Sequence, residues 1–287
     1  MDSLDYKKLT PNEQKAYDGI LSFLVFLDSI QVNNLPTING YVTAPEVSLV
    51  LSVQDYQEAI HSQSYAYTIE SVVPKNKREK IYDFWRNDSV LLERNKYIAE
   101  IYQEFTDNPT DENYFKVLIA NYLLEGLYFY NGFNYFYNLS SRNLMAGTSD
   151  IIRYINRDEL THCVVFENFI KTIKVEFPQM YNSEIIRDMF QEATTQEIKW
   201  TNHIIGDSIL GINEDSTDRY TKWMVNNRLN KLGEPALFLD PKYESNPYKH
   251  LEKIADTEGS GDVKGNFFES TISSYNQSSA VDGWDDF

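Results

Sequence analysis

The sequence has very little cysteine. Cys163 is the one cysteine among 287 residues, so the chain can form no internal disulfide. Disulfides persist mainly in oxidising compartments, and this composition is therefore typical of a protein of the reducing cytosol. The first residues, MDSLDYKKLTPNEQ, also lack the apolar stretch of a secretory signal peptide. We therefore expect a cytoplasmic protein.

Long hydrophobic runs and an excess of positive charge are also missing. The longest apolar run, residues 20–27, is too short to span a bilayer, for which about 20 residues are needed. The formal net charge is −17, with 43 acidic against 26 basic residues. Nucleic acid and anionic membranes would both repel such a chain. We therefore expect neither of them as a partner.

No run of alternating strand residues is present, whereas helix signals recur. Thr10, Pro11 and Glu13 form an N-cap, a proline at the first helical position and a reciprocal capping glutamate. The same pattern returns at residues 43–46, with Thr43 in the capping position. Proline and glycine then delimit the segments. The sequence predicts an all-α fold with helices over about 11–32, 43–74, 76–86, 89–106, 111–141, 149–176, 183–209 and 216–231.

The composition changes after Pro241. Residues 242–287 are rich in Ser, Gly, Asn and Asp, and aromatic residues are scattered among them. Such a segment is either a solvated tail or a chain that docks into a partner's groove. We therefore divide the chain into a helical domain, 1–241, and a flexible C-terminal tail, 242–287.

A repeated motif carries the first chemical signal. Glu58 and His61 are three residues apart, as are Glu159 and His162, and each pair lies inside a predicted helix. This spacing places the carboxylate and the imidazole on one helix face, within reach of one metal centre. A single Glu-x-x-His pair is usually an exposed surface pair, but two copies on different helices favour metal ligation.

Two further carboxylates interrupt apolar helix faces. Asp28 ends a stripe that contains Leu21 and Leu24, and Glu125 shares a face with Tyr122 and Phe129. An unpaired buried carboxylate costs several kcal/mol, so each needs a cation nearby. Neither stripe offers a Lys or Arg at helical spacing, whereas a shared metal pair would supply the missing charge.

Together these residues predict a dinuclear carboxylate site in a ferritin-like helical bundle. Two Glu-x-x-His helices and two helices with one carboxylate each form the ligand set of such di-iron and di-manganese proteins. Oxygen-rich ligation with some nitrogen suits two Fe, two Mn or a mixed Mn/Fe pair, and it does not choose among them. The predicted ligands are Asp28, Glu58, His61, Glu125, Glu159 and His162.

Tyr65 lies on the same helix face as Glu58 and His61. Its ring is therefore expected within a helical turn of the metals. Core packing explains this position as well as a redox role does, since the same helix also carries Tyr56 and Tyr67.

Four segments in order resemble the small subunit of class I ribonucleotide reductase: FLDSIQ (26–31), EAIHSQSY (58–65), LEG (124–126) and IIRYINRDELTH (151–162). The resemblance runs from about Leu9 to Phe287. It implies the six metal ligands above, with Tyr65 as the carrier of a stored radical. It also implies a dry pocket around that radical, formed by Phe129, Phe133 and Ile155.

The resemblance implies a function in ribonucleotide reduction as well. The metal pair would activate oxygen to oxidise Tyr65, and the radical would pass to a large subunit that binds the ribonucleotides. Asp158 would hydrogen-bond His61 on this route, and Tyr275 with Glu269 would relay the radical from the tail. The C-terminal GWDDF, 283–287, would anchor the large subunit, and the small subunit would itself be a homodimer.

One departure from the family concerns the N-terminal side. The family carries a relay tryptophan upstream of the first core helix, whereas Trp85, Trp200, Trp223 and Trp284 all lie downstream of it here. We therefore expect a separate N-terminal small-subunit fragment to supply that residue, and apolar surface to be exposed on the first core helix without it.

Two rival functions remain open at this level. One is a ferritin-like di-metal oxidase with its own substrate, which would have no need of the tail around Tyr275. The other is a partner-binding homologue that has lost radical transfer, which a radical signal would exclude. The sequence also leaves open whether activation needs a flavoprotein.

Overall fold

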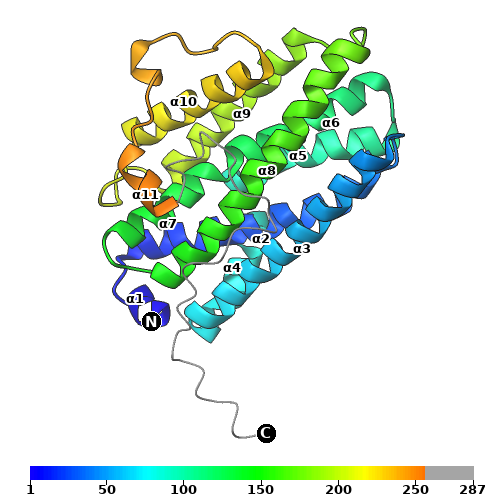
Figure 1. The fold of residues 1–287 in the computed structure, drawn as a ribbon. Helices are drawn as coiled ribbons and strands as arrows, with labels where there is room; N and C mark the ends of the chain where they lie inside the picture. Colours follow the sequence, from blue (N-terminus) through cyan, green and yellow to red (C-terminus); the bar gives the residue numbers. More distant parts are fainter. Residues whose placement is uncertain (256–287) are drawn as a thin grey trace, which may run out of the picture.

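The computed structural model describes residues 1–255 and is built from helices (Figure 1). Its described part contains no β-strand, and the predicted all-α fold is confirmed. The elements are α1 (Asp2–Tyr6), α2 (Pro11–Asn39), α3 (Pro45–Val72), α4 (Lys75–Asn87), α5 (Ser89–Asp107), α6 (Asp111–Leu123), the π-helix η1 (Leu124–Tyr128), α7 (Tyr130–Ser141), α8 (Ala146–Glu176), α9 (Ser183–Ile204), α10 (Glu214–Leu232), the short 3-10 turns η2 (Pro241–Tyr243) and η3 (Lys249–Leu251), and α11 (Glu252–Ala255).

The helix starts follow capping chemistry at one predicted site and not at the other. At α2 the Thr10 side chain accepts from the Glu13 backbone N–H, and Glu13 accepts in turn from the backbone of Thr10. At α3 the prediction is wrong, because the capping position is Ala44 and no side chain caps it. Pro45 already occupies the first helical position and needs no hydrogen-bond partner there. Thr43 therefore lies one residue too early.

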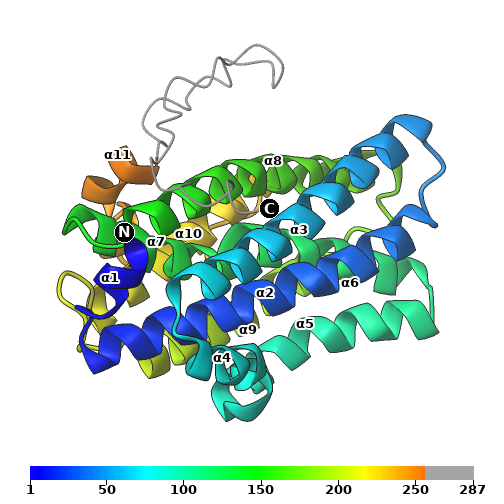
Figure 2. The same cartoon turned by 90° about the horizontal axis from the view of Figure 1, so that it is seen from below.

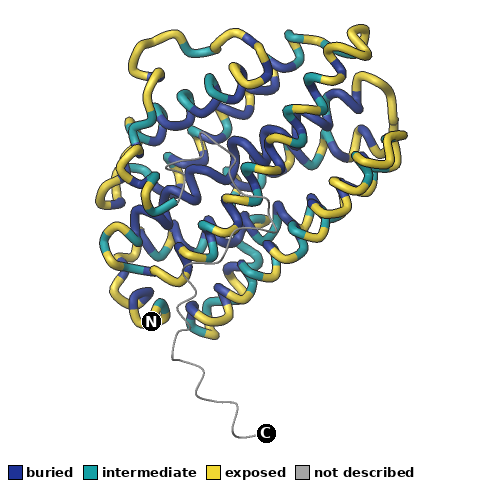
Figure 3. Tube along the Cα trace, in the orientation of Figure 1, coloured by how far each residue is buried: buried dark blue, intermediate teal, exposed yellow. Residues whose placement is uncertain are grey.

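The centre of the bundle is the continuous segment α6–η1–α7. Residues 113–139 are all buried except Lys116, which is half-buried. In the burial view this segment forms the dark core of the molecule (Figure 3). A helix that is covered on every side must be surrounded by others. Figures 1 and 2 show α2, α3 and α8 along one side of it and α9 and α10 along the other.

The predicted helix 111–141 is interrupted by the π-helical turn η1. A π-turn leaves carbonyl groups out of register with the normal helix ladder, so they need other donors. Arg228 donates from Nε to the Gly126 carbonyl at 3.0 Å, and Arg94 donates from Nη2 to the Tyr128 carbonyl at 2.7 Å. A Cβ at Gly126 would lie 3.0 Å from Arg228 Nε, so the close approach favours glycine. The turn carries Glu125.

Helix α2 differs from its predicted extent and surface. It runs past the expected end at residue 32 to Asn39, with the exposed Pro36 inside it. None of its large apolar side chains is exposed, because α3, α4 and the buried core cover them. The expectation that this helix exposes apolar surface is therefore wrong. Within the described residues, no helix is long and apolar enough to cross a membrane.

Residues 241–255 pack on the bundle beyond the boundary expected at 241. Tyr248 is buried, and its ring lies 5.2 Å from that of Tyr220 on α10. Leu251 is also buried. The predicted relay residues Glu269 and Tyr275, and the C-terminal GWDDF, lie outside the described residues.

Candidate metal centre

The structure brings the six predicted ligands together. Asp28 comes from α2, Glu58 and His61 from α3, Glu125 from η1, and Glu159 and His162 from α8. They form two groups in which the ligand atoms all lie within 4.8 Å of one another. Asp28 and His61 belong to one group, Glu125 and His162 to the other, and Glu58 and Glu159 to both. Two overlapping clusters of carboxylate and imidazole groups suit two metal ions held side by side.

Burial leaves these polar atoms without ordinary partners. All four carboxylates are 0% exposed, and the two imidazoles are at most 2% exposed. No hydrogen bond within the described part of the chain satisfies either oxygen of Asp28, Glu58 Oε2, Glu125 Oε2, Glu159 Oε1 or His61 Nδ1. Buried polar atoms normally have partners, so orphans that converge on one point indicate a ligand.

Both histidines turn the same ring nitrogen inward. His61 Nδ1 lies 3.1 Å from Glu159 and 3.5 Å from Glu58, and His162 Nδ1 lies 2.7 Å from Glu159 and 3.1 Å from Glu58. Their outward Nε2 atoms face fixed oxygens: Asp158 Oδ2 at 3.2 Å from His61, and Gln57 Oε1 at 3.1 Å from His162. An outer acceptor of this kind holds the proton on Nε2 and leaves Nδ1 free to bind a metal.

The charges in the centre are poorly balanced by protein groups alone. Burial, and then the neighbouring Glu58, raises the pKa of both Asp28 and Glu125 well above its usual range. Burial acts the same way on Glu159, but the two imidazoles outweigh it and lower the pKa of that carboxyl. In the absence of cations, protons must therefore compensate the buried negative charge. Metal binding would displace those protons.

The donor set fits a pair of divalent ions. Four carboxylates balance four positive charges, and two imidazoles complete an oxygen-rich shell suited to Fe or Mn. No lysine or arginine forms an ion pair with any of the six residues in the described structure. A metal pair would satisfy both the orphaned atoms and the missing charge.

Tyr65 is fully enclosed beside this centre. It is 1% exposed, and its hydroxyl has no hydrogen-bond partner among the described residues. Burial, and then the charge of Asp28, raises the pKa of its hydroxyl well above its usual value. The predicted pocket residues Phe129, Phe133 and Ile155 are also buried, and the two phenylalanine rings stack 5.9 Å apart.

The sequence reasoning missed three glutamines around the ligands. Gln31 and Gln54 both donate to Glu125 Oε1, the latter at 3.1 Å, and Gln57 faces His162. A signal was present, since they stand three or four residues from Asp28, Glu58 and His61 on the same helices. Such amides are common on polar helix faces, and only the fold shows which of them turn inward.

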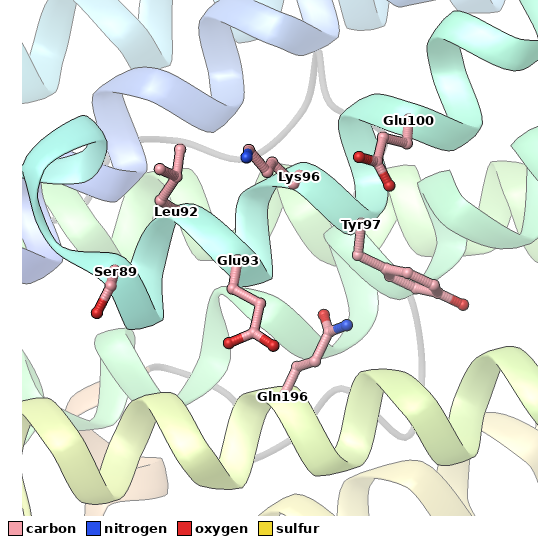
Figure 4. A pocket seen from close by; sticks show the side chains of 7 residues that line it. All are labelled: Ser89, Leu92, Glu93, Lys96, Tyr97, Glu100 and Gln196. Atoms are coloured by element: carbon pink, nitrogen blue, oxygen red, sulfur yellow. The ribbon is translucent and has the colours of Figure 1, made fainter.

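Two cavities lie outside the six-residue cluster. A shallow groove of about 360 Å³ lies between α5 and α9, and Figure 4 shows Glu93, Lys96 and Gln196 along it. A second cavity of about 330 Å³ is bounded by α7, α8, α10 and α11 and includes Asn156 and Arg228. Neither includes any of the six predicted ligands.

Comparison with known sequences points to one family. A model of the family "Ribonucleotide reductase, small chain" matches residues 1–247. The chain is 42% identical over 283 residues to the ribonucleoside-diphosphate reductase subunit beta of Treponema pallidum, covering 98% of this chain and 80% of that protein. It is 37% identical over 288 residues to the protein of the same name from Halalkalibacterium halodurans, covering 99% and 82%.

Solved structures agree with the sequence comparison. The ribonucleotide reductase R2 subunit from Clostridium botulinum superposes with a TM-score of 0.85 at 43% identity, over 88% of this chain and 80% of that one. A dimanganese(II)-NrdF from Streptococcus sanguinis gives 0.74 at 22% identity, over 88% and 87%. At that identity the second likeness concerns the fold alone.

Proposed function

The chain belongs to the ribonucleotide reductase small-chain family, and from that premise we propose that it is the radical-generating beta subunit of a class I ribonucleoside-diphosphate reductase. The observation that carries this proposal is the convergence of four buried carboxylates and two imidazoles beside an enclosed tyrosine. The reduction itself would take place on the large subunit.

Six residues would hold the two ions: Asp28, Glu58, His61, Glu125, Glu159 and His162. When bound, the metal pair supplies the oxidising power, drawn from O2 or a reduced oxygen species, that a tyrosine needs to lose an electron. Glu58 and Glu159 would be shared between the ions, since each belongs to both ligand groups. The donor set accommodates two Fe, two Mn or a mixed pair.

Tyr65 would store the radical. Its hydroxyl is protonated at neutral pH because burial opposes the charged form, so oxidation must remove a proton together with the electron. The enclosed position keeps water and external reductants away from the ring. Phe129, Phe133 and Ile155 bring no ionisable group to this region, which favours a long-lived radical.

Asp158 and the tail would connect the centre to the large subunit. Asp158 accepts from His61 Nε2 and is 27% exposed, so it links a ligand to the protein surface. Tyr275, assisted by Glu269, would relay the radical, and the C-terminal GWDDF would bind the partner. Residues 242–287 would serve as the docking tail, with its first part, up to 255, packed on the bundle.

The family pairs with a large subunit and assembles as a dimer. The outer face of α3 is suited to the contact between two copies of this chain. It exposes an apolar row at helical spacing, while the opposite face holds Glu58 and His61. Contiguous exposed apolar surface marks interaction sites. The row consists of Leu49, Val53, Tyr56, Ile60 and Tyr67.

The test is an electron paramagnetic resonance spectrum of freshly activated protein, with turnover measured after addition of the large subunit. We expect a tyrosyl signal and reduction of ribonucleoside diphosphates. Tyr65→Phe should keep its metal content, because only one hydroxyl is removed and the six predicted ligands are unchanged. It should lose both the tyrosyl signal and turnover, because phenylalanine has no hydroxyl to oxidise. The matched control is Tyr154→Phe, which alters a 39% exposed ring on α8, outside the proposed dimer contact. A tyrosyl signal that survives in Tyr65→Phe refutes the assignment.

A further inference from the structure

A line of buried polar groups approaches the centre from α5. The hydroxyl of Tyr102 on α5 donates to Gln31 Oε1 on α2 at 2.8 Å. The amide nitrogen of Gln31 then donates to Glu125 Oε1 on the π-turn. Tyr102 is 5% exposed and Gln31 is 0% exposed, so neither exchanges its partner for water. The line thus joins three elements and ends on a predicted metal ligand.

The direction of each hydrogen bond in this line is fixed by chemistry. A carboxylate that binds a metal is ionised and only accepts, so in the metal-bound protein Gln31 would have to turn its NH2 group toward Glu125, as it does here. Its carbonyl oxygen then faces Tyr102, which must act as donor. The opposite amide orientation would set a carbonyl oxygen against a carboxylate oxygen. The carboxylate therefore sets which end of Gln31 faces the centre, and the tyrosine hydroxyl holds the amide in that orientation by donating to its oxygen.

The two oxygens of Glu125 have different surroundings. Oε1 accepts from both Gln31 and Gln54, the latter at 3.1 Å. Oε2 has no hydrogen-bond partner in the described part of the chain and lies 3.5 Å from His162 Nδ1. The amides therefore hold one oxygen back and leave the other directed at the ligand cluster.

We propose that Tyr102 and Gln31 are positioning residues that fix the rotamer of Glu125 and thereby set the affinity of one of the two metal positions. The proposal rests on the proposed function, since it takes Glu125 to be a ligand. Glu125 belongs only to the group with His162, so the group with Asp28 and His61 should be spared. Neither residue contacts the ion; Tyr102 acts through Gln31, and Gln31 acts through Glu125.

The test is a titration of metal-free protein with Mn²⁺, followed by calorimetry and by the spectrum of the spin-coupled Mn²⁺ pair. Outer partners of metal ligands typically contribute about 10- to 100-fold in affinity. Tyr102→Phe removes one oxygen and should weaken one Mn²⁺ position about 10-fold, with the coupled spectrum appearing later in the titration. Gln31→Met keeps the side-chain length and should weaken the same position at least as much.

The double variant Tyr102→Phe/Gln31→Met separates positioning from general loosening. If Tyr102 acts through Gln31, the double variant binds Mn²⁺ no more weakly than Gln31→Met alone. Tyr17→Phe is the matched control, because Tyr17 is equally buried and its hydroxyl pairs with Thr148, remote from the ligands. It should bind Mn²⁺ like the unaltered chain.

Three outcomes overturn the proposal: unchanged Mn²⁺ affinity in Tyr102→Phe, additive losses in the double variant, or an equal loss in Tyr17→Phe. Failure of the proposed function itself would look different, because the unaltered chain would then take up no Mn²⁺ pair at all. Thermal unfolding of the metal-free variants shows whether each is folded, and the comparison with Tyr17→Phe corrects for any shared loss of stability.

Discussion

At the scale of single residues, substitutions of shared and of unshared predicted ligands should have different effects on metal binding. Glu58 and Glu159 belong to both ligand groups, whereas Asp28 belongs to one. Removing a shared carboxylate would take an oxygen donor and a negative charge from both of the proposed ions. Removing an unshared one affects a single ion. The two kinds of variant should therefore differ in how many ions they retain.

Glu159→Ala should bind well under one ion per chain under conditions in which the unaltered chain binds about two, the number a dinuclear site holds. Asp28→Asn should retain about one, because the group around Glu125 and His162 stays complete. Equilibrium dialysis with Mn²⁺ followed by elemental analysis gives both numbers. The control is Glu167→Ala on α8, whose carboxylate pairs with Lys171 away from the centre. Equal retention in Glu159→Ala and Asp28→Asn contradicts the shared-ligand arrangement.

Several residues of the site could be predicted because they break a pattern. Asp28 and Glu125 stand out as carboxylates on apolar helix faces, and the two Glu-x-x-His pairs repeat. Tyr102 could not be predicted in the same way. It lies on an amphipathic helix like many core tyrosines, and only the packing of α5 against α2 places its hydroxyl on Gln31.

At the scale of elements, the main departure from prediction is the π-turn. The sequence predicts one helix over 111–141, and nothing in its apolar pattern sets Leu124–Tyr128 apart. The turn depends on Arg94 and Arg228, which are distant in sequence and donate to its carbonyls. A long-range hydrogen bond of this kind leaves no trace in periodicity. At Thr43 the error is of the opposite kind. The sequence contains a capping pattern, but Pro45 takes the first helical position, so the cap falls at Ala44 and the Thr43 side chain does not cap the helix.

Arg94 also forms a buried ion pair between α5 and α9. Its Nη2 lies 2.6 Å from Glu197 Oε2, and Glu197 Oε1 accepts from Asn131 at 3.1 Å. Both side chains of the pair are 1% exposed. Removing one partner of such a pair leaves an uncompensated buried charge, which is far more costly than losing an exposed pair.

We expect Arg94→Met to lower the free energy of unfolding by about 3–5 kcal/mol. The double variant Arg94→Met/Glu197→Leu should recover part of this loss, because it removes the stranded carboxylate. Arg78→Met is the control and should lose no more than about 1 kcal/mol, since its pair with Glu70 is largely in solvent. Urea unfolding measures all three. If Arg94→Met loses no more than Arg78→Met, the ion pair does not hold α5 and α9 together.

At the scale of the whole molecule, α3 has two different faces. The inner face supplies Glu58, His61 and Tyr65, and the outer face carries the exposed apolar row. Val53 is 59% exposed and Ile60, two turns further along the same face, is 41% exposed, and a contiguous exposed apolar row of this kind marks an interaction site. In a two-fold dimer the same patch contributes from both copies, so each substitution acts twice.

Val53→Asp/Ile60→Asp should therefore raise the dimer dissociation constant by at least about 100-fold, since buried apolar anchors are often worth 2 kcal/mol or more each. Sedimentation equilibrium measures the change, and circular dichroism checks the fold. Leu239→Asp, at an 82% exposed site after α10, should leave the dimer unchanged. A double variant that remains as dimeric as the unaltered chain excludes this face of α3 as the contact.

The enclosure of the six predicted ligands also bears on how fast a metal centre there would fill. With every carboxylate ligand 0% exposed, an ion in solution cannot reach the site while the helices stay closed. Loading must wait for a transient local opening of the bundle, which has its own rate. At high metal concentration that opening becomes the slow step, and the speed of filling levels off. The helices that would shield a stored radical would thus also limit how fast the centre is assembled.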